Sequence, residues 1–252
     1  MTSVSNAAVG AFLAGNAAAK ARHGMNEAIA RLSTGVRSMY GGDAAGASVA
    51  HTLRADGRSA LMAARNVEDG ISFLQAGESA LLEIAALNTR LRELAVQDLN
   101  AAFLDANQEA AITAEETAIA AAANAIDTAT LNNTALLTAT IAFVRDMDGS
   151  TTSFGAAADL TIASGVTAVD TQMGKISKAL GSMAAGISAL KGHQGTLYAL
   201  SANAEAAAAR IQDTDFARSS ANLAKFSILN QSAMAMVSQA NQANAAVLAV
   251  LN

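Results

Sequence analysis

The sequence predicts a mainly α-helical protein, in which a long antiparallel coiled coil or helical bundle forms a rod that carries a small β-hairpin. The first observation is that the 252 residues include no proline, so no proline ring interrupts a helix. The second is the abundance of alanine, leucine, glutamine and glutamate, which favour helices. The third is that apolar residues recur every three or four positions, as on one face of a helix.

Two apolar stripes predict helices in the N-terminal half. The first stripe consists of Met25, Ile29, Leu32, Val36 and Met39. The second and longer stripe consists of Val67, Ile71, Leu74, Leu81, Ile84, Leu87, Leu91 and Leu94. Between them, four glycines predict an irregular loop that breaks the helix: Gly35, Gly41, Gly42 and Gly46.

The middle of the chain predicts one more helix and then a hairpin. Thr113 and Glu116 have the spacing of a capping box, so we expect an alanine-rich helix to begin there. Further along, β-branched and aromatic residues alternate around the turn dipeptide Asp148-Gly149. This pattern predicts a β-hairpin near residues 140–165.

The closing segment predicts a coiled-coil seam. Its apolar residues are spaced alternately by three and four positions, an average of about 3.5 that is typical of a supercoiled helix rather than a globular one. The residues of this predicted seam are Phe226, Leu229, Ala233, Met236, Ala240, Ala243, Val247 and Val250.

Both ends of the chain lack charged side chains. Residues 1–19 contain none, and none follows Lys225. We therefore expect the two ends to pair with each other in antiparallel fashion, away from bulk water. Two thin helices cannot cover each other completely, so copies of the same chain are expected to finish their burial. Such a surface predicts an open-ended, helical assembly rather than a closed dimer.

Composition argues against several other classes of protein. The net charge of −5 is unlike the basic face of a nucleic-acid binder. The absence of cysteine removes disulfides, thiol nucleophiles and thiolate metal sites. No uninterrupted apolar run is long enough for a membrane span, and we expect the N-terminal segment to be retained rather than cleaved as a signal peptide.

The sequence contains no pattern of an active site. It has no His-Glu-x-x-His, no phosphate-binding loop and no nucleophile elbow, and its three histidines have no partner at metal-ligand spacing. We therefore predict no catalytic residue, no metal and no cofactor, and we expect a protein that is not an enzyme.

Charged residues near the breaks between helices suggest two local roles. Asp43 with Arg31 and Arg37 predicts an ion pair at the bend after the first helix, either between subunits or as a solvated loop charge. Asp213 and Asp215 precede the last helix, where carboxylates favour the helix N-terminus, and we expect them to cap it.

Several motifs, in order, resemble the bacterial flagellin family. The stretch "RLSTGVRSMYGGDAAGASVA" is similar to the flagellin signature, and "ARNVEDGISFLQAGESALLEI" and "LNTRLRELAVQ" resemble its next blocks. Near the C-terminus, "ARIQDTDFARSSANLAKFSILNQSAMAMVSQAN" follows the pattern of the family's last segment. The resemblance covers residues 1–135 and 172–252, so several independent motifs agree in order and register.

The resemblance implies a division into domains. Residues 1–40 and 213–252 would form the two halves of the inner coiled-coil domain, which lines the filament's inner tube. Residues 41–212 would form the rod-like helical bundle with its hairpin. Only residues 136–171 separate the matching halves, so the variable outer domain of many flagellins is expected to be absent. The last segment departs from the family by lacking proline, which predicts a straighter final helix.

The resemblance also implies the function and the partners. The chain would be secreted through the flagellum-specific type III export channel and would polymerise into the extracellular filament that drives swimming. An export chaperone, the filament cap and hook-junction proteins would be its partners, beside many copies of itself. The alternatives are a minor flagellin, a hook–filament junction protein or a flagellin-like cell-surface binding protein.

We expect the apolar residues of the terminal segments to make the contacts between subunits. These residues are Phe12, Leu13, Met25, Ile29, Leu32, Phe226, Leu229, Ala233, Met236, Ala240, Val247 and Val250.

The resemblance implies two further sites. Arg90 and Leu94 match positions that contact a vertebrate innate immune receptor in some flagellins, but the acidic partner is displaced from position 114 to Glu115. The alternative is that Arg90 contacts another subunit in the filament or is simply a solvated charge on the helix. We favour this alternative over receptor binding. Residues at the expected hairpin tip are candidates for O-glycosylation: Ser150, Thr151, Thr152 and Ser153.

Overall fold

The computed structural model describes residues 2–251, except 38–41, 139, 145, 147 and 157–159. The mainly helical fold predicted from the sequence is confirmed, although Met39 of the first predicted stripe lies outside the described residues. The long helices are α1 (Thr2–Thr34), α2 (Ala44–Asp98), α3 (Ala106–Asp127), α4 (Val166–Gln212) and α5 (Phe216–Leu251), with one 3-10 turn η1 (Ala101–Phe103).

The chain forms two compact units. The first, the terminal unit, comprises Met1–Ala55 and Ala204–Asn252, and the second, the central unit, comprises Asp56–Asn203. Helices α2 and α4 each contribute to both units. The boundaries predicted after residues 40 and 212 concern the layers of a filament, and they stay predictions.

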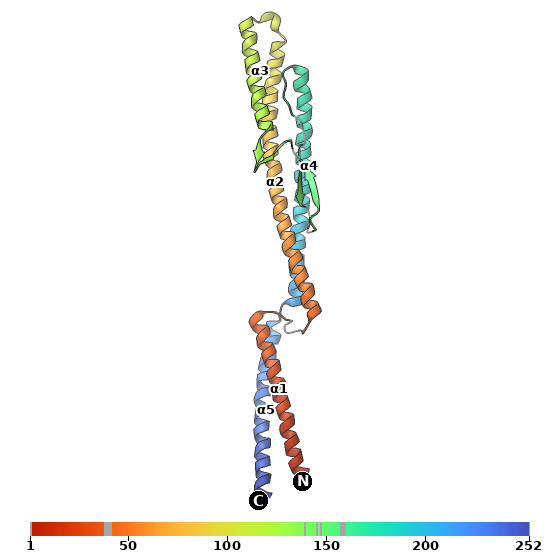
Figure 1. Cartoon of the computed structure of the whole chain (residues 1–252), viewed down its shortest axis with the longest axis vertical. Helices are drawn as coiled ribbons and strands as arrows, with labels where there is room; N and C mark the ends of the chain where they lie inside the picture. The colour runs from red at the N-terminus through yellow and green to blue at the C-terminus, as the bar shows by residue number, and fades with distance from the viewer. Residues whose placement is uncertain are drawn as a thin grey trace. The chain divides into compact units, whose positions relative to one another are not determined.

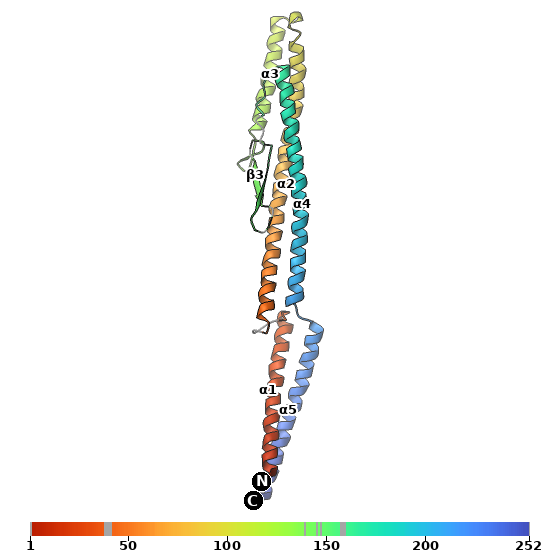
Figure 2. The same cartoon turned by 90° about the vertical axis from the view of Figure 1, so that its right-hand side faces the viewer.

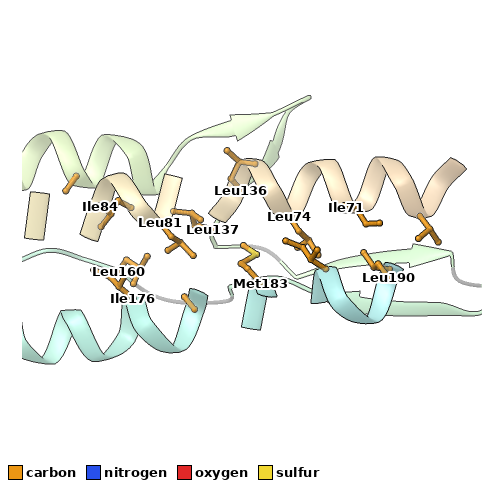
Figure 3. Packing of buried hydrophobic residues seen from close by; sticks show 14 of the residues in the cluster. Ile71, Leu74, Leu81, Ile84, Leu136, Leu137, Leu160, Ile176, Met183 and Leu190 are labelled. Atoms are coloured by element: carbon orange, nitrogen blue, oxygen red, sulfur yellow. The ribbon is translucent and has the colours of Figure 1, made fainter. Parts of the chain in front are cut away.

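The core of the central unit lies between α2 and α4. Leu74, Leu81 and Ile84 of α2 point toward Ile176 and Met183 of α4 (Figure 3). Leu137 and Leu160, from the segment that connects α3 to α4, complete this core and are fully buried. The long apolar stripe predicted for residues 67–94 is therefore confirmed as the core face of α2, with Leu87 half-buried at its edge.

The predicted β-hairpin is present within residues 140–165. Strand β3 (Ile141–Val144) pairs antiparallel with β4 (Thr151–Phe154), with Ile141 opposite Phe154. At the turn, Gly149 has a φ of +80°, and the side chain of Asp146 accepts a hydrogen bond from the Ser150 amide at 2.8 Å. The hairpin lies alongside α2 and α4, on the same side of them as α3 (Figure 2).

Two glycines allow the hairpin to approach the helices closely. The Phe143 ring lies over Gly70 of α2, where an added Cβ would come within 2.6 Å of it. Phe154 lies in the same way beside Gly186 of α4, at 3.1 Å from such a Cβ. The Phe143 ring also contacts Phe73 with a centroid separation of 6.5 Å, so aromatic packing attaches the hairpin to the bundle.

A second, shorter hairpin was not predicted. Strand β1 (Thr130–Leu131) pairs with β2 (Thr134–Ala135) across Asn132 and Asn133, whose φ angles are 50° and 61°. Asparagine tolerates this left-handed conformation, which a type I′ turn requires at both central positions. The Asn-Asn pair was the signal in the sequence, but each strand is too short to show an alternating pattern.

The predicted start of the third helix is wrong. Helix α3 begins at Ala106, and Asp105 caps it by accepting hydrogen bonds from the amides of Asn107 and Gln108. The Gln108 side chain accepts from the Asp105 amide in return, which completes a capping box. Thr113 lies inside the helix. Two capping patterns were present, at residues 105–108 and 113–116, and the earlier one caps the free amides of the helix.

The loop after α1 is shorter than the glycines predicted. Helix α1 ends at Thr34, and Gly35 follows with a φ of +70°, but Gly46 lies inside the first turn of α2. Its amide donates a hydrogen bond of 2.8 Å to Asp43, whose carboxylate thereby caps α2. This bond and the adjacent Arg37 hold the pKa of the Asp43 carboxyl below its usual value.

Candidate assembly surface

The terminal unit is built on the pairing of α1 with α5. These helices lie side by side and antiparallel, so that both ends of the chain lie at the same end of the pair (Figure 1). The predicted pairing of the two charge-free ends is confirmed within one chain. Each helix covers only one face of the other, so the outer faces of the pair stay free for other contacts.

The face of α1 that meets α5 is made mostly of alanine. Its buried and half-buried residues are spaced alternately by three and four positions: Ala11, Ala14, Ala18, Ala21, Met25, Ala28 and Leu32. Met25 and Leu32 of the predicted stripe belong to this face, whereas Ile29 is 47% exposed. Alanine lets the helices approach closely but buries little apolar area, so this seam alone contributes little free energy.

The seam of α5 corrects the predicted one. Phe226, Ala233 and Ala240 face α1 as expected, but Leu229 and Met236 are 45% and 62% exposed, and Ala243 is exposed too. The observed seam is Ser219, Leu223, Phe226, Asn230, Ala233, Val237, Ala240 and Asn244. Phe226, Ala233 and Ala240 belong to both the predicted and the observed seam. The error came from requiring apolar residues throughout, because two seam positions are asparagines.

One contact fixes the two helices against each other. The Phe226 ring lies directly over Gly24 of α1, where an added Cβ would be 2.6 Å from the ring atoms. Gly24 is buried, while Phe226 is half-buried. A small pocket beside them is lined by Glu27 and Ala28 among others. No motif signalled this pair, because the two residues are far apart in the sequence.

Toward the chain ends, in residues 2–19 and 226–251, the outward faces of the pair carry large apolar residues and no charged side chain. Phe12 and Leu13 of α1 are 68% and 62% exposed, and Ile228 of α5 is 63% exposed. An open groove of about 470 Å³ runs along α5 beside Met234 and Val237. The side chains of Val247 and Val250 lie outside those that the structure describes. This combination of exposed large apolar groups without charges is typical of a surface that another protein covers.

The other end of the terminal unit carries the charges and the chain connections. Arg37 donates its backbone amide to the Gln212 carbonyl at 2.7 Å, and Thr214 donates to the Gly35 carbonyl at 2.8 Å. Arg37 also forms an ion pair with Asp43 at 2.7 Å. Within one chain Arg31 pairs with Glu27 one turn earlier and not with Asp43, and the predicted pair between subunits stays a prediction.

The predicted caps of the last helix are half right. Asp215 accepts a hydrogen bond of 3.0 Å from the amide of Arg218 and so caps α5. Asp213 does not cap the helix. It pairs in β fashion with Val36, and its carboxylate lies 3.4 Å from Arg54.

The central unit contains the predicted receptor patch. Arg90 donates hydrogen bonds of 2.8 Å and 3.0 Å to Glu115 and lies 3.0 Å from Glu93. These acidic partners raise the pKa of the Arg90 guanidinium, with Glu115 the larger cause. Leu94 is only 1% exposed and packs in the interior. The structure therefore presents Arg90 at the surface but not Leu94.

The predicted glycosylation residues alternate along the second hairpin strand. Thr151 and Ser153 are exposed, whereas Ser150 and Thr152 are half-buried. The Thr152 hydroxyl is shielded from solvent. Of the four hydroxyl residues, only Thr151 and Ser153 therefore present their side chains freely.

Among the described residues, no cluster of three or more metal-ligating side chains exists. In the same part of the chain, no helix combines the length and the apolar character needed to cross a bilayer.

Comparison with known proteins places both helical halves in one context. Residues 6–142 match the family model of the bacterial flagellin N-terminal helical region, and residues 166–251 match that of the C-terminal helical region. A flagellin of Halalkalibacterium halodurans is 32% identical, over 89% of this chain and 91% of its own. Flagellins of Listeria innocua and Bacillus subtilis are each 28% identical, over 88% of this chain and 90% of theirs.

Proposed function

This chain belongs to the bacterial flagellin family and is a structural, non-enzymatic subunit of the extracellular flagellar filament; from this premise we propose that copies of the chain cover the outward faces of α1 and α5. The observation that carries the proposal is the exposure of large apolar side chains, above all Phe12 and Met236, on the segments of α1 and α5 that have no charged residue, namely residues 2–19 and 226–251. Burying each such side chain contributes about 1.5–3 kcal/mol.

The predicted interface residues divide into two groups in this proposal. Met25, Leu32, Phe226, Ala233 and Ala240 hold α1 against α5 within one chain. The residues of the second group pack against neighbouring copies of the chain: Phe12, Leu13, Ile29, Leu229 and Met236. Val247 and Val250 are assigned to the second group from the sequence alone.

The alanine seam has a consequence for the monomer. Ordering a residue costs about 1–2 kcal/mol of backbone entropy, and small side chains return little of it by burial. We therefore expect α1 and the end of α5 to be weakly ordered before assembly and to become rigid in the filament. Amide exchange on the monomer checks this expectation, and strong protection of residues 226–250 would contradict it.

The terminal segments are also expected to bind other proteins on the way to the filament. A segment with exposed apolar residues and no charge needs a cover in the cytosol, so an export chaperone is its expected first partner. At the growing end of the filament, the cap and the hook-junction proteins are expected to bind the same apolar surface of α1 and α5. Pull-down from cell extract with the full chain and with a variant that lacks residues 230–252 tests this. The chaperone is expected to bind only the full chain.

Two sites on the central unit have narrower roles in this proposal. We assign Arg90 to the ion pairs with Glu115 and Glu93 rather than to receptor binding, because Leu94 is buried. A receptor reporter assay with purified monomer is expected to give no response, and a response at low dose would overturn the assignment. If the hairpin is glycosylated, Thr151 and Ser153 are the expected sites, which intact-mass measurement of filaments decides.

Truncation tests the proposed function directly. Deleting residues 230–252 removes the outward apolar residues of α5 after Leu229 but leaves the central unit intact. We expect the variant to form no filaments when salted out, as seen by electron microscopy, while circular dichroism still shows a helical protein. Normal filaments from this variant would refute the assignment of the terminal surface.

A further inference from the structure

The outward surface of α5 carries two exposed methionines. Met236 is 62% exposed and Met234 is 50% exposed, whereas Met183 of the central unit is fully buried. The chain contains no cysteine and no tryptophan, so methionine is its most readily oxidised side chain. A thioether that is open to solvent takes up one oxygen from a peroxide and becomes a polar sulfoxide. Both methionines of α5 are therefore accessible to a peroxide in a chain that has not yet assembled.

The two methionines lie on different sides of α5. They are two positions apart, which is roughly 200° around a helix. The sulfur of Met234 lies 3.9 Å from a guanidinium nitrogen of Arg22 on α1. Met236 shares its side of the helix with Leu229, seven positions earlier, which is 45% exposed. Met234 thus lies beside a charged donor of its own chain, and Met236 lies on the apolar outward face.

Arg22 has donors to spare for a stronger acceptor than a thioether. Its side chain is exposed, and among the described residues it forms no ion pair. Sulfur accepts hydrogen bonds only weakly, while a sulfoxide oxygen on Met234 would be a good acceptor within reach of this guanidinium. Met236 has no equivalent, because residues 226–251 contain no charged side chain.

We propose that Met236 is an oxidation site at which a peroxide keeps the subunit out of the filament. This inference rests on the proposed function, which places Met236 against neighbouring copies. In the reaction, a lone pair of the thioether sulfur attacks one oxygen of hydrogen peroxide, and the O–O bond breaks as the S–O bond forms. The sulfur gives two electrons to the peroxide, whose second oxygen leaves as water with both protons.

The sulfoxide of Met236 opposes assembly because it is polar. Burying its oxygen between copies without a donor costs free energy that burial of the thioether does not. The side chain also loses the apolar, adaptable character that suits an interface. The sulfoxide of Met234 is tolerated, because Arg22 of the same chain donates to its oxygen. Two methionines of similar exposure therefore differ in what their oxidation does to assembly.

Partition of a partly oxidised sample tests the site without altering the chain. Purified monomer is treated with hydrogen peroxide and polymerised, and the filaments are sedimented. Peptide mass spectrometry, with fragment ions that distinguish Met234 from Met236, then measures each sulfoxide in pellet and supernatant. We expect Met236 sulfoxide to be depleted in the filaments about tenfold. Met62 of α2, which is 53% exposed, is the internal control, and its sulfoxide should partition evenly within about twofold.

The outcomes separate this inference from the proposed function. An equal share of Met236 sulfoxide in filaments and supernatant overturns the oxidation site. Equal depletion of Met62 sulfoxide shows unspecific damage and also counts against it. Peroxide treatment of finished filaments tests the coverage itself, and Met236 should be oxidised about tenfold more slowly there than in the monomer. Oxidation at the same rate would overturn the placement of Met236 against neighbouring copies, which belongs to the proposed function.

Reduction tests whether the sulfoxide alone causes the exclusion. Methionine sulfoxide reductases convert the sulfoxide back to the thioether. Chains from the supernatant should therefore enter filaments again after this treatment. Chains that stay excluded once Met236 is reduced would overturn the oxidation site.

Arg22 provides an independent test through Met234. In the natural chain, Met234 sulfoxide is expected to partition like Met62 sulfoxide. Arg22→Leu removes the donor, so Met234 sulfoxide should then be depleted severalfold in the filaments. Lys20→Leu removes a charge two positions earlier on α1, and this matched control should leave the partition of Met234 sulfoxide unchanged. Depletion of Met234 sulfoxide in filaments of the natural chain would overturn the role of Arg22.

Discussion

The aromatic ring of Phe226 on α5 packs against Gly24 on α1, in a space that leaves no room for a side chain. An added Cβ on Gly24 would lie 2.6 Å from the ring. The two residues belong to opposite ends of the chain, so their contact exists only when α1 and α5 are paired. It is therefore a specific probe of that pairing.

Gly24→Ala is expected to weaken the helix pair despite improving helix propensity. Overpacking of this kind costs about 1–3 kcal/mol, and we expect a higher critical concentration for filament formation. Gly15→Ala is the control, because no atom lies within 4 Å of a Cβ there. Combining Gly24→Ala with Phe226→Leu should restore much of the loss. An equal effect of the two glycine substitutions would contradict the packing argument.

Asn88 is the fully buried polar residue in the interface between α2 and α4. It donates its side-chain amide to the Val169 carbonyl at 3.1 Å, while its own side-chain oxygen has no hydrogen-bond partner. Asn88→Ala removes the bond and leaves a cavity, so thermal unfolding should show a loss of about 1–3 kcal/mol.

Asn88→Leu distinguishes the role of that polar group from its volume. It fills a similar space and removes the unpaired oxygen, so stability should be unchanged or higher than in Asn88→Ala. Thr89→Ala, at an exposed position of the same helix, should change stability by less than about 0.5 kcal/mol. A loss as large for Asn88→Leu as for Asn88→Ala would show that the hydrogen bond is essential.

Glu116 on α3 makes stability depend on pH. Its burial raises the pKa of the carboxyl above the ordinary value of 4.5, and the negative charge of Asp98 adds to the rise. The folded state therefore holds the proton more tightly than the unfolded chain. The contribution of Glu116 to stability is fully present below the unfolded pKa and is lost as pH rises through the higher folded pKa.

Glu116→Gln should remove this dependence. We expect the variant to be more stable than the natural chain at pH 7, and the difference between them to shrink as pH falls through and below the raised pKa. Thermal unfolding over that range measures it. Glu83→Gln, at an exposed position of α2, serves as the control and should follow the natural chain. A difference that grows toward low pH would reverse the sign and refute the burial argument.

Gly70 determines how closely the β3–β4 hairpin approaches α2. Gly70→Ala places a methyl group 2.6 Å from the Phe143 ring, so the hairpin must shift outward. We expect faster amide exchange in residues 141–144 and 151–154, with the helices retained. Gly174→Ala has open space around it and should leave that exchange unchanged. Retained protection in Gly70→Ala would show that the helix, rather than the hairpin, gives way.

Local signals in the sequence were sufficient for α1, α2, α5, the main hairpin and the core stripe of α2, whereas no apolar stripe was identified for α4 and the start of α3 was misplaced. Periodicity identifies the face of a helix because each residue's direction follows from its position along the same helix. The motifs at both ends identified the family, and the charge-free termini predicted that α1 and α5 pair. These properties depend on neighbours along the chain or on composition.

Only the tertiary structure decided which residues meet across the chain. The seam of α5 runs through Asn230 and Asn244, whose side-chain oxygens are buried, rather than through Leu229 and Met236, which stay exposed. The pairing of Phe226 with Gly24 and the burial of Leu94 likewise depend on partners far away in the sequence. Periodicity gives a helix its faces, but the shape of the opposing surface selects which face is buried.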